Sequence, residues 1–161
     1  MAIRKEELQL NTQQDMSSED IYVLKKLFTE YVSLYRLELN SGKYEILRLV
    51  ENTNAKQLVG EEHTIFADYD EFTRRYADAF VPETEQEEFL DWHKCENLKK
   101  RLQEKESLTY YYHSVSKDGK DSYYEAYAVK GKADGKNFYI FLGYRNVDVI
   151  LYKEKAIQEQ L

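Results

Sequence analysis

Thiol and imidazole side chains, which serve as nucleophiles, general bases and metal ligands, are scarce in this 161-residue chain. There is one cysteine, Cys95, and there are three histidines, His63, His93 and His113. A single cysteine excludes a disulfide framework and a metal site made of several cysteines. Metal sites need clustered ligands, whereas His63 stands alone among acidic residues. The sequence therefore predicts no metal site.

Sequence patterns that carry enzymatic chemistry are missing as well. Serine, histidine and aspartate all occur, but no Gly-x-Ser-x-Gly segment presents a serine nucleophile at a strand-to-helix turn. The sequence also lacks a glycine-rich loop that could cradle a phosphate group. We therefore expect that this chain is not an enzyme, although its parent protein could carry a catalytic domain.

Acidic residues outnumber basic ones and are concentrated in the middle of the chain. The 30 acidic and 23 basic residues give a net charge of −7. Residues 61–91 hold eleven acidic and two basic residues, a net charge of 2 − 11 = −9. Such a run is typical of a solvated helical face, and no basic stripe exists that a nucleic-acid backbone could follow. We expect no nucleic-acid partner.

The hydropathy of the chain predicts a cytoplasmic protein. Hydrophobic residues make up 42% and charged residues 33% of the sequence, which suits a globular domain. No segment approaches the roughly 18 consecutive apolar residues that span a bilayer. Residues 1–10 lack the apolar centre of a signal peptide. We therefore expect no membrane segment in this chain.

Hydrophobic spacing predicts an ordered series of helices and strands. Apolar residues at helical spacing, alternation with a period of two, and turn residues define each element. Ser17 and Asp20 have the spacing of a capping box, which predicts a helix start there. After this helix we expect strands over 35–39 and 43–50 around a turn at 40–42, helices over 68–80, after Pro82 and over 96–105, strands over 108–116, 121–130 and 137–146, and a helix over 147–161.

Two Asp-Gly pairs, Asp118-Gly119 and Asp134-Gly135, separate the last three predicted strands. Asp-Gly favours tight hairpins because both residues tolerate positive φ. An early hairpin and a three-stranded meander give five antiparallel strands, with helices on one face, in an α+β domain. The expected boundaries are 1–18 for a flexible or helical N-terminal arm, 19–146 for the domain, and 147–161 for a C-terminal linker helix.

Tyrosine is the dominant aromatic residue, with 15 copies, and eight of them lie in the last three predicted strands. Because tyrosine has an apolar ring and a polar tip, these residues could line a small-molecule cavity between the sheet and the helices. Ordinary sheet packing is the alternative. A glycine within a strand marks a bulge or a close approach. The candidate pocket residues are Tyr35, Tyr112, Tyr127, Tyr144 and Gly143.

Three segments, in this order, resemble the motifs of PAS domains, which are bacterial sensory modules. They are 34–45 (LYRLELNSGKYE), 80–89 (FVPETEQEEF) and 141–148 (FLGYRNVD), followed by a charged helix. The resemblance covers about residues 19–161 and is to the PAS domains that precede diguanylate cyclase (GGDEF) or histidine kinase domains. The chain departs from the family at Val81, where a histidine is frequent, and at Ile150, where the family has threonine.

The resemblance implies a sensory, signal-relay and dimerisation module without catalytic activity of its own. It implies a covalently linked effector outside this sequence, a homodimer formed through the flanking helices, and a possible small-molecule ligand. The C-terminal helix, with its seam of apolar residues at heptad spacing, would pass the signal to the effector. The junction residues expected to do so are Asn146, Asp148, Ile150, Ile157 and Leu161.

No cofactor is expected. Flavin-binding relatives carry a reactive cysteine in an Asn-Cys-Arg-Phe-Leu string, whereas Cys95 lies in the segment 93–98 (HKCENL). Haem-binding relatives supply an axial histidine from the middle helices, and His93 or His63 could be proposed for it. No second signal accompanies either histidine, so we expect no haem.

Two other functions stay open at this point. One is an α+β cone of the nuclear-transport-factor-like type, which binds small molecules and sometimes carries isomerase chemistry. The early hairpin at 40–42 argues against that fold, in which long helices come first. The other is a dimerisation scaffold that binds no ligand.

Overall fold

The computed structural model describes residues 17–27, 29–50, 53–58 and 65–160. Most of the expected N-terminal arm, His63 and the predicted junction residue Leu161 lie outside these residues. The chain divides into two compact units, Met1–Glu30 and Tyr31–Leu161, which are described separately.

The first unit contains one described helix, α2 (Ser18–Leu27). Its first turn is capped by Ser17, whose Oγ accepts a hydrogen bond from the backbone N of Asp20 at 3.1 Å. Serine at this position satisfies a backbone N–H that has no partner within the helix. The helix start predicted at Ser17 is therefore confirmed.

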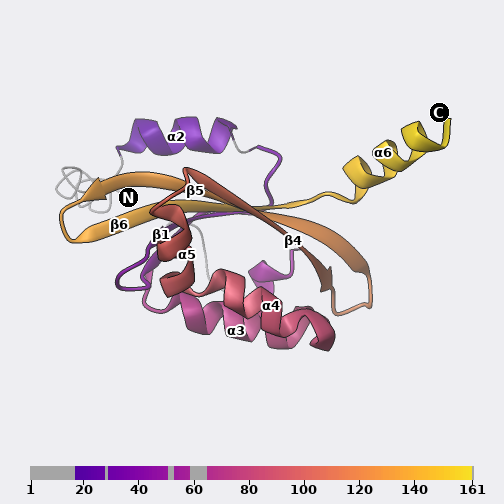
Figure 1. The fold of residues 1–161 in the computed structure, drawn as a ribbon, viewed down its shortest axis with the longest axis horizontal. Helices are drawn as coiled ribbons and strands as arrows, with labels where there is room; N and C mark the ends of the chain where they lie inside the picture. Colours follow the sequence, from indigo (N-terminus) through magenta and orange to yellow (C-terminus); the bar gives the residue numbers. More distant parts are fainter. Residues whose placement is uncertain (1–16, 28, 51–52, 59–64, 161) are drawn as a thin grey trace. The chain divides into compact units, whose positions relative to one another are not determined.

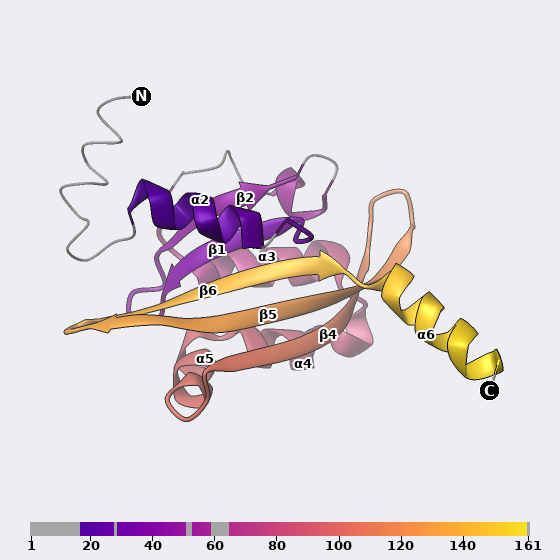
Figure 2. The same ribbon diagram turned by 90° about the horizontal axis from the view of Figure 1, so that it is seen from above.

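The second unit is an α+β fold built on a six-stranded antiparallel sheet (Figures 1 and 2), with the strand order β3-β2-β1-β6-β5-β4. Its elements are β1 (Ser33–Glu38), β2 (Tyr44–Leu49), the 3-10 helix η1 (Ala55–Gln57), β3 (Ile65–Phe66), α3 (Tyr69–Phe80), α4 (Glu83–His93), α5 (Cys95–Leu102), β4 (Ser107–Val115), β5 (Asp121–Asp134), β6 (Asn137–Asn146) and α6 (Asp148–Gln160). The prediction of five strands misses β3, because a two-residue strand is too short to show alternation.

Both predicted Asp-Gly hairpins form. Gly119 and Gly135 have positive φ, 83° and 50°, which glycine adopts without steric cost. In the second hairpin Asp134 pairs with Asn137, so the two-residue turn is Gly135-Lys136 and Asp134 is the last residue of its strand. The first hairpin joins nine consecutive residue pairs of β4 and β5 with no shift in register.

The middle helices start and stop where the sequence predicts a break. The Asp68 carboxylate accepts a hydrogen bond from Glu71 N at 3.0 Å and caps α3. Val81 then adopts an extended conformation and Pro82 precedes the first residue of α4. Proline has no N–H to donate to the preceding turn, so α3 cannot continue through it.

Helices α3, α4 and α5 lie against one face of the sheet (Figure 1). Alternate residues of the strands point to this face and form the core with the helices. Leu37 and Ile140 from the sheet and Leu98 from α5 are fully buried there. The α+β class and the single covering layer of helices agree with the sequence prediction.

Glu38 holds the early hairpin to the rest of the sheet. Its carboxylate accepts hydrogen bonds from the backbone N of Asn40 (3.1 Å), Ser41 (2.8 Å) and Phe138 (2.7 Å). Burial opposes its ionisation, but these bonds outweigh that effect and lower the pKa of Glu38 below its ordinary value. One carboxylate thus fixes the turn after β1 and the first residues of β6.

The face of the sheet opposite α3, α4 and α5 carries a charged cluster around a glycine. Arg145 donates to the Glu125 carboxylate from Nε and from a terminal guanidinium nitrogen, at 3.1 and 3.2 Å. The Tyr31 hydroxyl donates to the same carboxylate at 3.3 Å. The Tyr31 ring lies over Gly143, where an added Cβ would come within 2.6 Å of Cδ2 of that ring. The absence of a side chain at Gly143 therefore allows the Tyr31 ring to approach the strand closely, as a glycine within a strand suggests.

Replacing Gly143 tests this contact. We expect Gly143→Ala to lower the free energy of unfolding by about 1–3 kcal/mol, because the methyl group overlaps the Tyr31 ring. In a Tyr31→Ala background the same substitution should cost much less, because the ring is gone. Urea denaturation of the four proteins gives both values. Equal costs in the two backgrounds would contradict the contact.

Candidate functional site

A small cavity lies between the sheet, α3 and η1, and tyrosine is the commonest residue in its wall. Three of the predicted pocket residues, Tyr35, Tyr112 and Tyr144, contribute to its wall together with Tyr69 and Tyr76 of α3. Its volume is about 30 Å³. A water molecule needs roughly 10–15 Å³ measured in this way, whereas ligand pockets are roughly 300–1,000 Å³. In this conformation the cavity has room for about two waters and none for a metabolite.

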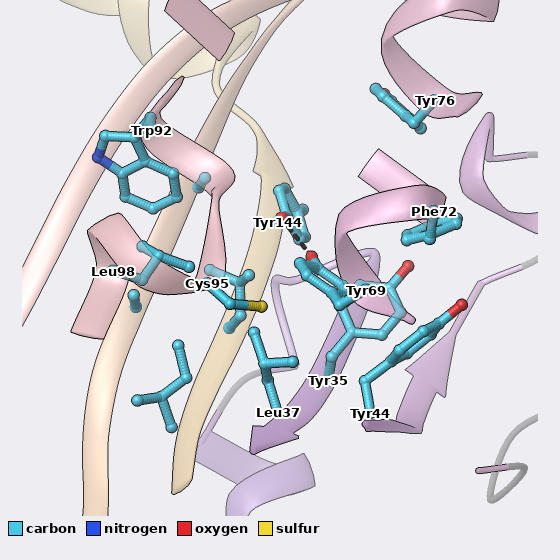
Figure 3. Close-up of a cluster of buried hydrophobic side chains, with 14 of the residues drawn as sticks. Tyr35, Leu37, Tyr44, Tyr69, Phe72, Tyr76, Trp92, Cys95, Leu98 and Tyr144 are labelled. Carbon is cyan, nitrogen blue, oxygen red and sulfur yellow. Dashed lines mark hydrogen bonds between the residues drawn. The ribbon is translucent and has the colours of Figure 1, made fainter. Parts of the chain in front are cut away.

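Hydroxyl groups at the cavity wall are hydrogen-bonded to one another. The hydroxyls of Tyr69 and Tyr144 lie 2.7 Å apart and join α3 to β6 (Figure 3). The Tyr76 hydroxyl lies 2.5 Å from Ser114 Oγ, which also accepts from Asn54 Nδ2 at 2.8 Å. Burial raises the pKa of Tyr76 to about 12, and it raises the pKa of Tyr69 and of Tyr144 well above 10. All three phenols are therefore neutral at physiological pH.

Tyr35 is the centre of the aromatic group beside this cavity (Figure 3). Its ring is 5.9–6.1 Å, between centroids, from the rings of Tyr44, Tyr69, Phe72 and Tyr144. Its hydroxyl is buried and has no hydrogen-bond partner among the described residues. Burial raises the pKa of this phenol, and the nearby Ser33 hydroxyl partly offsets the rise. A water-sized guest in the cavity could supply the missing hydrogen bond.

The other two predicted pocket residues lie on the opposite face of the sheet. Tyr127 pairs with Gly143 in the register of β5 and β6, and both alternate with core residues such as Ala126 and Leu142. Adjacent residues of a strand point to opposite faces. The inward position expected for Tyr127 and Gly143 is therefore wrong: Gly143 instead receives the Tyr31 ring.

The predicted junction residues Asn146 and Asp148 form a hydrogen-bonded link between the sheet and α6. Asp148 N donates to Asn146 Oδ1 at 2.8 Å, and Asp148 Oδ1 accepts from Tyr123 N at 2.7 Å. Val147 N donates to Tyr123 O at 2.9 Å. The first turn of α6 is thereby bound to both β5 and β6, and an aspartate there is also favoured by the helix dipole.

Of the remaining junction residues, Ile157 has a described side chain. Ile157 lies on α6 with 60% of its surface exposed. Ile150 lies in the first turn of α6, where the structure describes the backbone alone, and Leu161 is outside the described residues. The heptad seam along α6 therefore stays a prediction.

His93 and Cys95 are packed into the core. His93 is fully buried, and its Nδ1 is 2.8 Å from the Phe89 carbonyl oxygen. Burial lowers the pKa of His93 to about 3. Cys95 is 5% exposed, and burial followed by the nearby Asp70 carboxylate raises its thiol pKa. These environments give a neutral imidazole and a protonated thiol, which is a poor nucleophile.

Metal-ligating side chains do not gather within the described part of the chain. No group of three or more His, Cys, Asp or Glu residues is close enough there to hold a metal ion. His113 approaches the Glu85 carboxylate of α4 at 3.0 Å, and this pair joins β4 to α4. Within the same described residues, no helix is long and apolar enough to cross a membrane.

Sequence reasoning missed the contribution of η1 and of the ends of β4 and β5. Asn54 and Ser114 are buried polar residues that join η1 to β4 through a direct hydrogen bond. They are 60 positions apart, and neither belongs to a recognisable motif. Tyr69 and Tyr76 carry a detectable signal, because both fall on the apolar face predicted for the helix over 68–80.

Comparisons with known proteins give similarity to solved structures alone. No protein-family model and no curated protein sequence matches this chain. A sensory box histidine kinase/response regulator from Burkholderia thailandensis is 12% identical, with 86% of this chain and 93% of that chain covered and a TM-score of 0.46. The PAS domain of Bordetella pertussis BvgS is 13% identical, with coverage of 89% and 100% and a TM-score of 0.46. We infer no function from likenesses at this level.

Burial of His93 predicts a pH dependence of stability. The unfolded chain binds a proton at this histidine near pH 6.5, whereas the folded protein binds it only near pH 3. The free energy of unfolding is therefore unaffected by His93 above pH 6.5. It falls as the pH drops from 6.5 toward 3, because the unfolded chain takes up a proton that the folded protein does not. The loss is about 1.4 kcal/mol per pH unit.

Removing the imidazole should remove this slope. We expect His93→Phe, or His93→Gln if the larger ring disturbs the core, to flatten the decline in unfolding free energy between pH 6.5 and 5. Leu98→Ala is the control, since it weakens the same core without removing a titratable group, and it should keep the wild-type slope. Urea denaturation across this pH range measures all of them. A His93 variant with the wild-type slope would show that His93 is protonated in the folded protein.

Proposed function

We propose that this chain is a PAS-like sensory and signal-relay module. The PAS-like motifs of the sequence and an α+β domain with helices on one face of an antiparallel sheet support this assignment. The module would regulate an effector, such as a histidine kinase or a diguanylate cyclase, attached beyond α6. It would act as a homodimer formed through the flanking helices.

The observation that carries the proposal is the link between α3, β6 and α6. The Tyr69 hydroxyl contacts the Tyr144 hydroxyl of β6 at 2.7 Å. Tyr144 lies two residues before Asn146, whose Oδ1 accepts from the first N–H of α6. A change in how α3 packs on the sheet would thus reach α6 through directly bonded residues, which is a physical route for coupling.

A shift in packing is what a relay of this kind requires. A signal changes the output by favouring one of two packings of the same fold. The contact between the Tyr69 and Tyr144 hydroxyls is a single hydrogen bond, so it can break without unfolding the core. Asp148 then determines whether α6 moves together with the sheet, because its carboxylate holds the first turn of α6 to Tyr123 of β5.

A dimerisation scaffold that binds no ligand is the second candidate. The observation that favours it is the tightly filled core, with a cavity of about 30 Å³. The nuclear-transport-factor-like alternative receives no such support: the early hairpin that argues against it is present, with Gly42 at a φ of 78° in its turn.

A double-mutant cycle read out at α6 tests the relay. We expect Tyr69→Phe to increase amide hydrogen exchange in the first turns of α6, because the bond to Tyr144 is lost. We expect Asp148→Ala to increase it further and to cancel the effect of Tyr69→Phe. Coupling of the usual size, roughly 0.5–2 kcal/mol, corresponds to about 2- to 30-fold in exchange rate. Hydrogen–deuterium exchange with mass spectrometry gives these rates.

Tyr139→Phe is the matched control, because it removes a hydroxyl from β6 on the other face of the sheet, where the Tyr139 ring contacts Arg36. It should leave exchange in α6 unchanged. The relay would be contradicted if Tyr69→Phe, folded at the temperature of the measurement, left exchange in α6 at the wild-type rate. A scaffold predicts that result.

A further inference from the structure

A second hollow, larger than the core cavity, lies between η1, the β4–β5 turn and the ends of β5 and β6. Its volume is about 350 Å³, which falls within the range of roughly 300–1,000 Å³ found for ligand pockets. It shares only Asn54 and Tyr124 with the 30 Å³ core cavity. By size, this hollow can hold a small metabolite and the core cavity cannot.

The floor of the hollow is polar although it is buried. Ser114 and Ser122 are paired in the register of β4 and β5, and they are 1% and 7% exposed. Asn54 of the adjoining segment is 9% exposed. The next pair on the same face of the strands is Tyr112–Tyr124, so small hydroxylated side chains replace aromatic rings where the hollow begins. Buried hydroxyl and amide groups of this kind fix polar ligands by hydrogen bonding.

The rim of the hollow is positively charged. Lys117 and Lys120 stand on the β4–β5 turn with Asp118 between them, which gives the residues that line the hollow a charge of +1; the exposed Asp121 follows Lys120 but does not line the hollow. The Asp118 carboxylate is engaged within the turn, where it accepts from the Ser116 hydroxyl and from Lys120 N. The ammonium groups of both lysines are exposed at the rim, in a protein whose net charge is −7. The hollow therefore favours an anion.

We propose that this hollow binds a small hydroxylated anion. The oxyanion, a phosphate or a carboxylate, would lie between Lys117 and Lys120. The hydroxyl groups of the ligand would meet Ser122, Asn54 and the exposed amide of Gln57 on the opposite wall. No arginine lines the hollow, so recognition rests on charge and hydroxyl contacts and not on a bidentate guanidinium clamp.

The hollow also reaches the end of β6, next to the start of α6. Asn146 lines it, and the same side chain accepts the hydrogen bond from Asp148 N. A ligand that draws Asn146 toward itself would weaken this bond. This transmission step rests on the proposed relay function, whereas binding in the hollow does not.

Three ligands with the same carbon skeleton test the site: glycerol 3-phosphate, glycerate and glycerol. We expect saturable amide shifts at 114–124 and 146 in ¹⁵N-edited NMR spectra with the phosphate, the carboxylate or both, and none with neutral glycerol. The comparison of the two anions identifies the oxyanion that the site prefers. Isothermal titration with the same ligands gives the affinities.

Lysine variants separate the site from general charge effects. Lys117→Ala/Lys120→Ala should weaken binding about 5- to 30-fold, as two exposed ion contacts would. Lys43→Ala/Lys105→Ala removes the same charge from exposed lysines outside the hollow and should leave the affinity unchanged. Ser122→Ala should weaken binding as well, because it removes a hydroxyl from the floor.

Three results would overturn the site: no saturable shift with either anion at millimolar concentration, equal shifts with glycerol, or equal loss of affinity in the two lysine pairs. Failure of the relay is a separate result. If the anions bind as expected while the amides of α6 keep their exchange rates, the site stands and transmission through Asn146 is wrong.

Discussion

Two buried tyrosine hydroxyls of α3 find hydrogen-bond partners on the sheet, and these pairs constrain how α3 meets the sheet. Leaving such a group unpaired costs about 1–3 kcal/mol, a large part of the stability of a small domain. Tyr69 pairs with Tyr144, and Tyr76 pairs with Ser114. The packing of α3 is therefore set by polar geometry as well as by the fit of aromatic rings.

The core between the sheet and the helices is built from neutral side chains and contains little empty volume. Burial raises the pKa of Tyr69, Tyr76 and Tyr144 and lowers the pKa of His93, so these core side chains are neutral. Charge lies on the other face of the sheet, where Arg145 pairs with Glu125, and at the rim of the polar hollow. The aromatic rings leave a cavity of about 30 Å³ between the sheet and α3. A signal would then act by altering hydrogen bonds between elements rather than by filling a large pre-formed core cavity.

Local chemistry made much of this fold predictable. Alternation in 35–39, the turn glycines, the Ser17 cap and the break at Pro82 all act within a few residues, so the sequence displays them. Asn146 and Asp148, which hydrogen-bond to each other at the start of α6, lie in a segment that resembles a family motif; their signalling role stays a prediction. What was missed depends on distant partners. The face on which Tyr127 and Gly143 lie follows from strand register, and the Asn54–Ser114 contact joins residues 60 positions apart.

The hydroxyl pair between Tyr69 and Tyr144 is the contact on which the proposed relay depends most directly. The coupling free energy between Tyr69→Phe and Tyr144→Phe, measured by urea denaturation of the wild type, both single variants and the double variant, tests it. Each single change leaves the other hydroxyl in the core without its hydrogen-bond partner, whereas the double change removes both hydroxyls. We expect a coupling of about 1 kcal/mol or more. Costs that add to within about 0.3 kcal/mol would show that the pair does not hold α3 to β6.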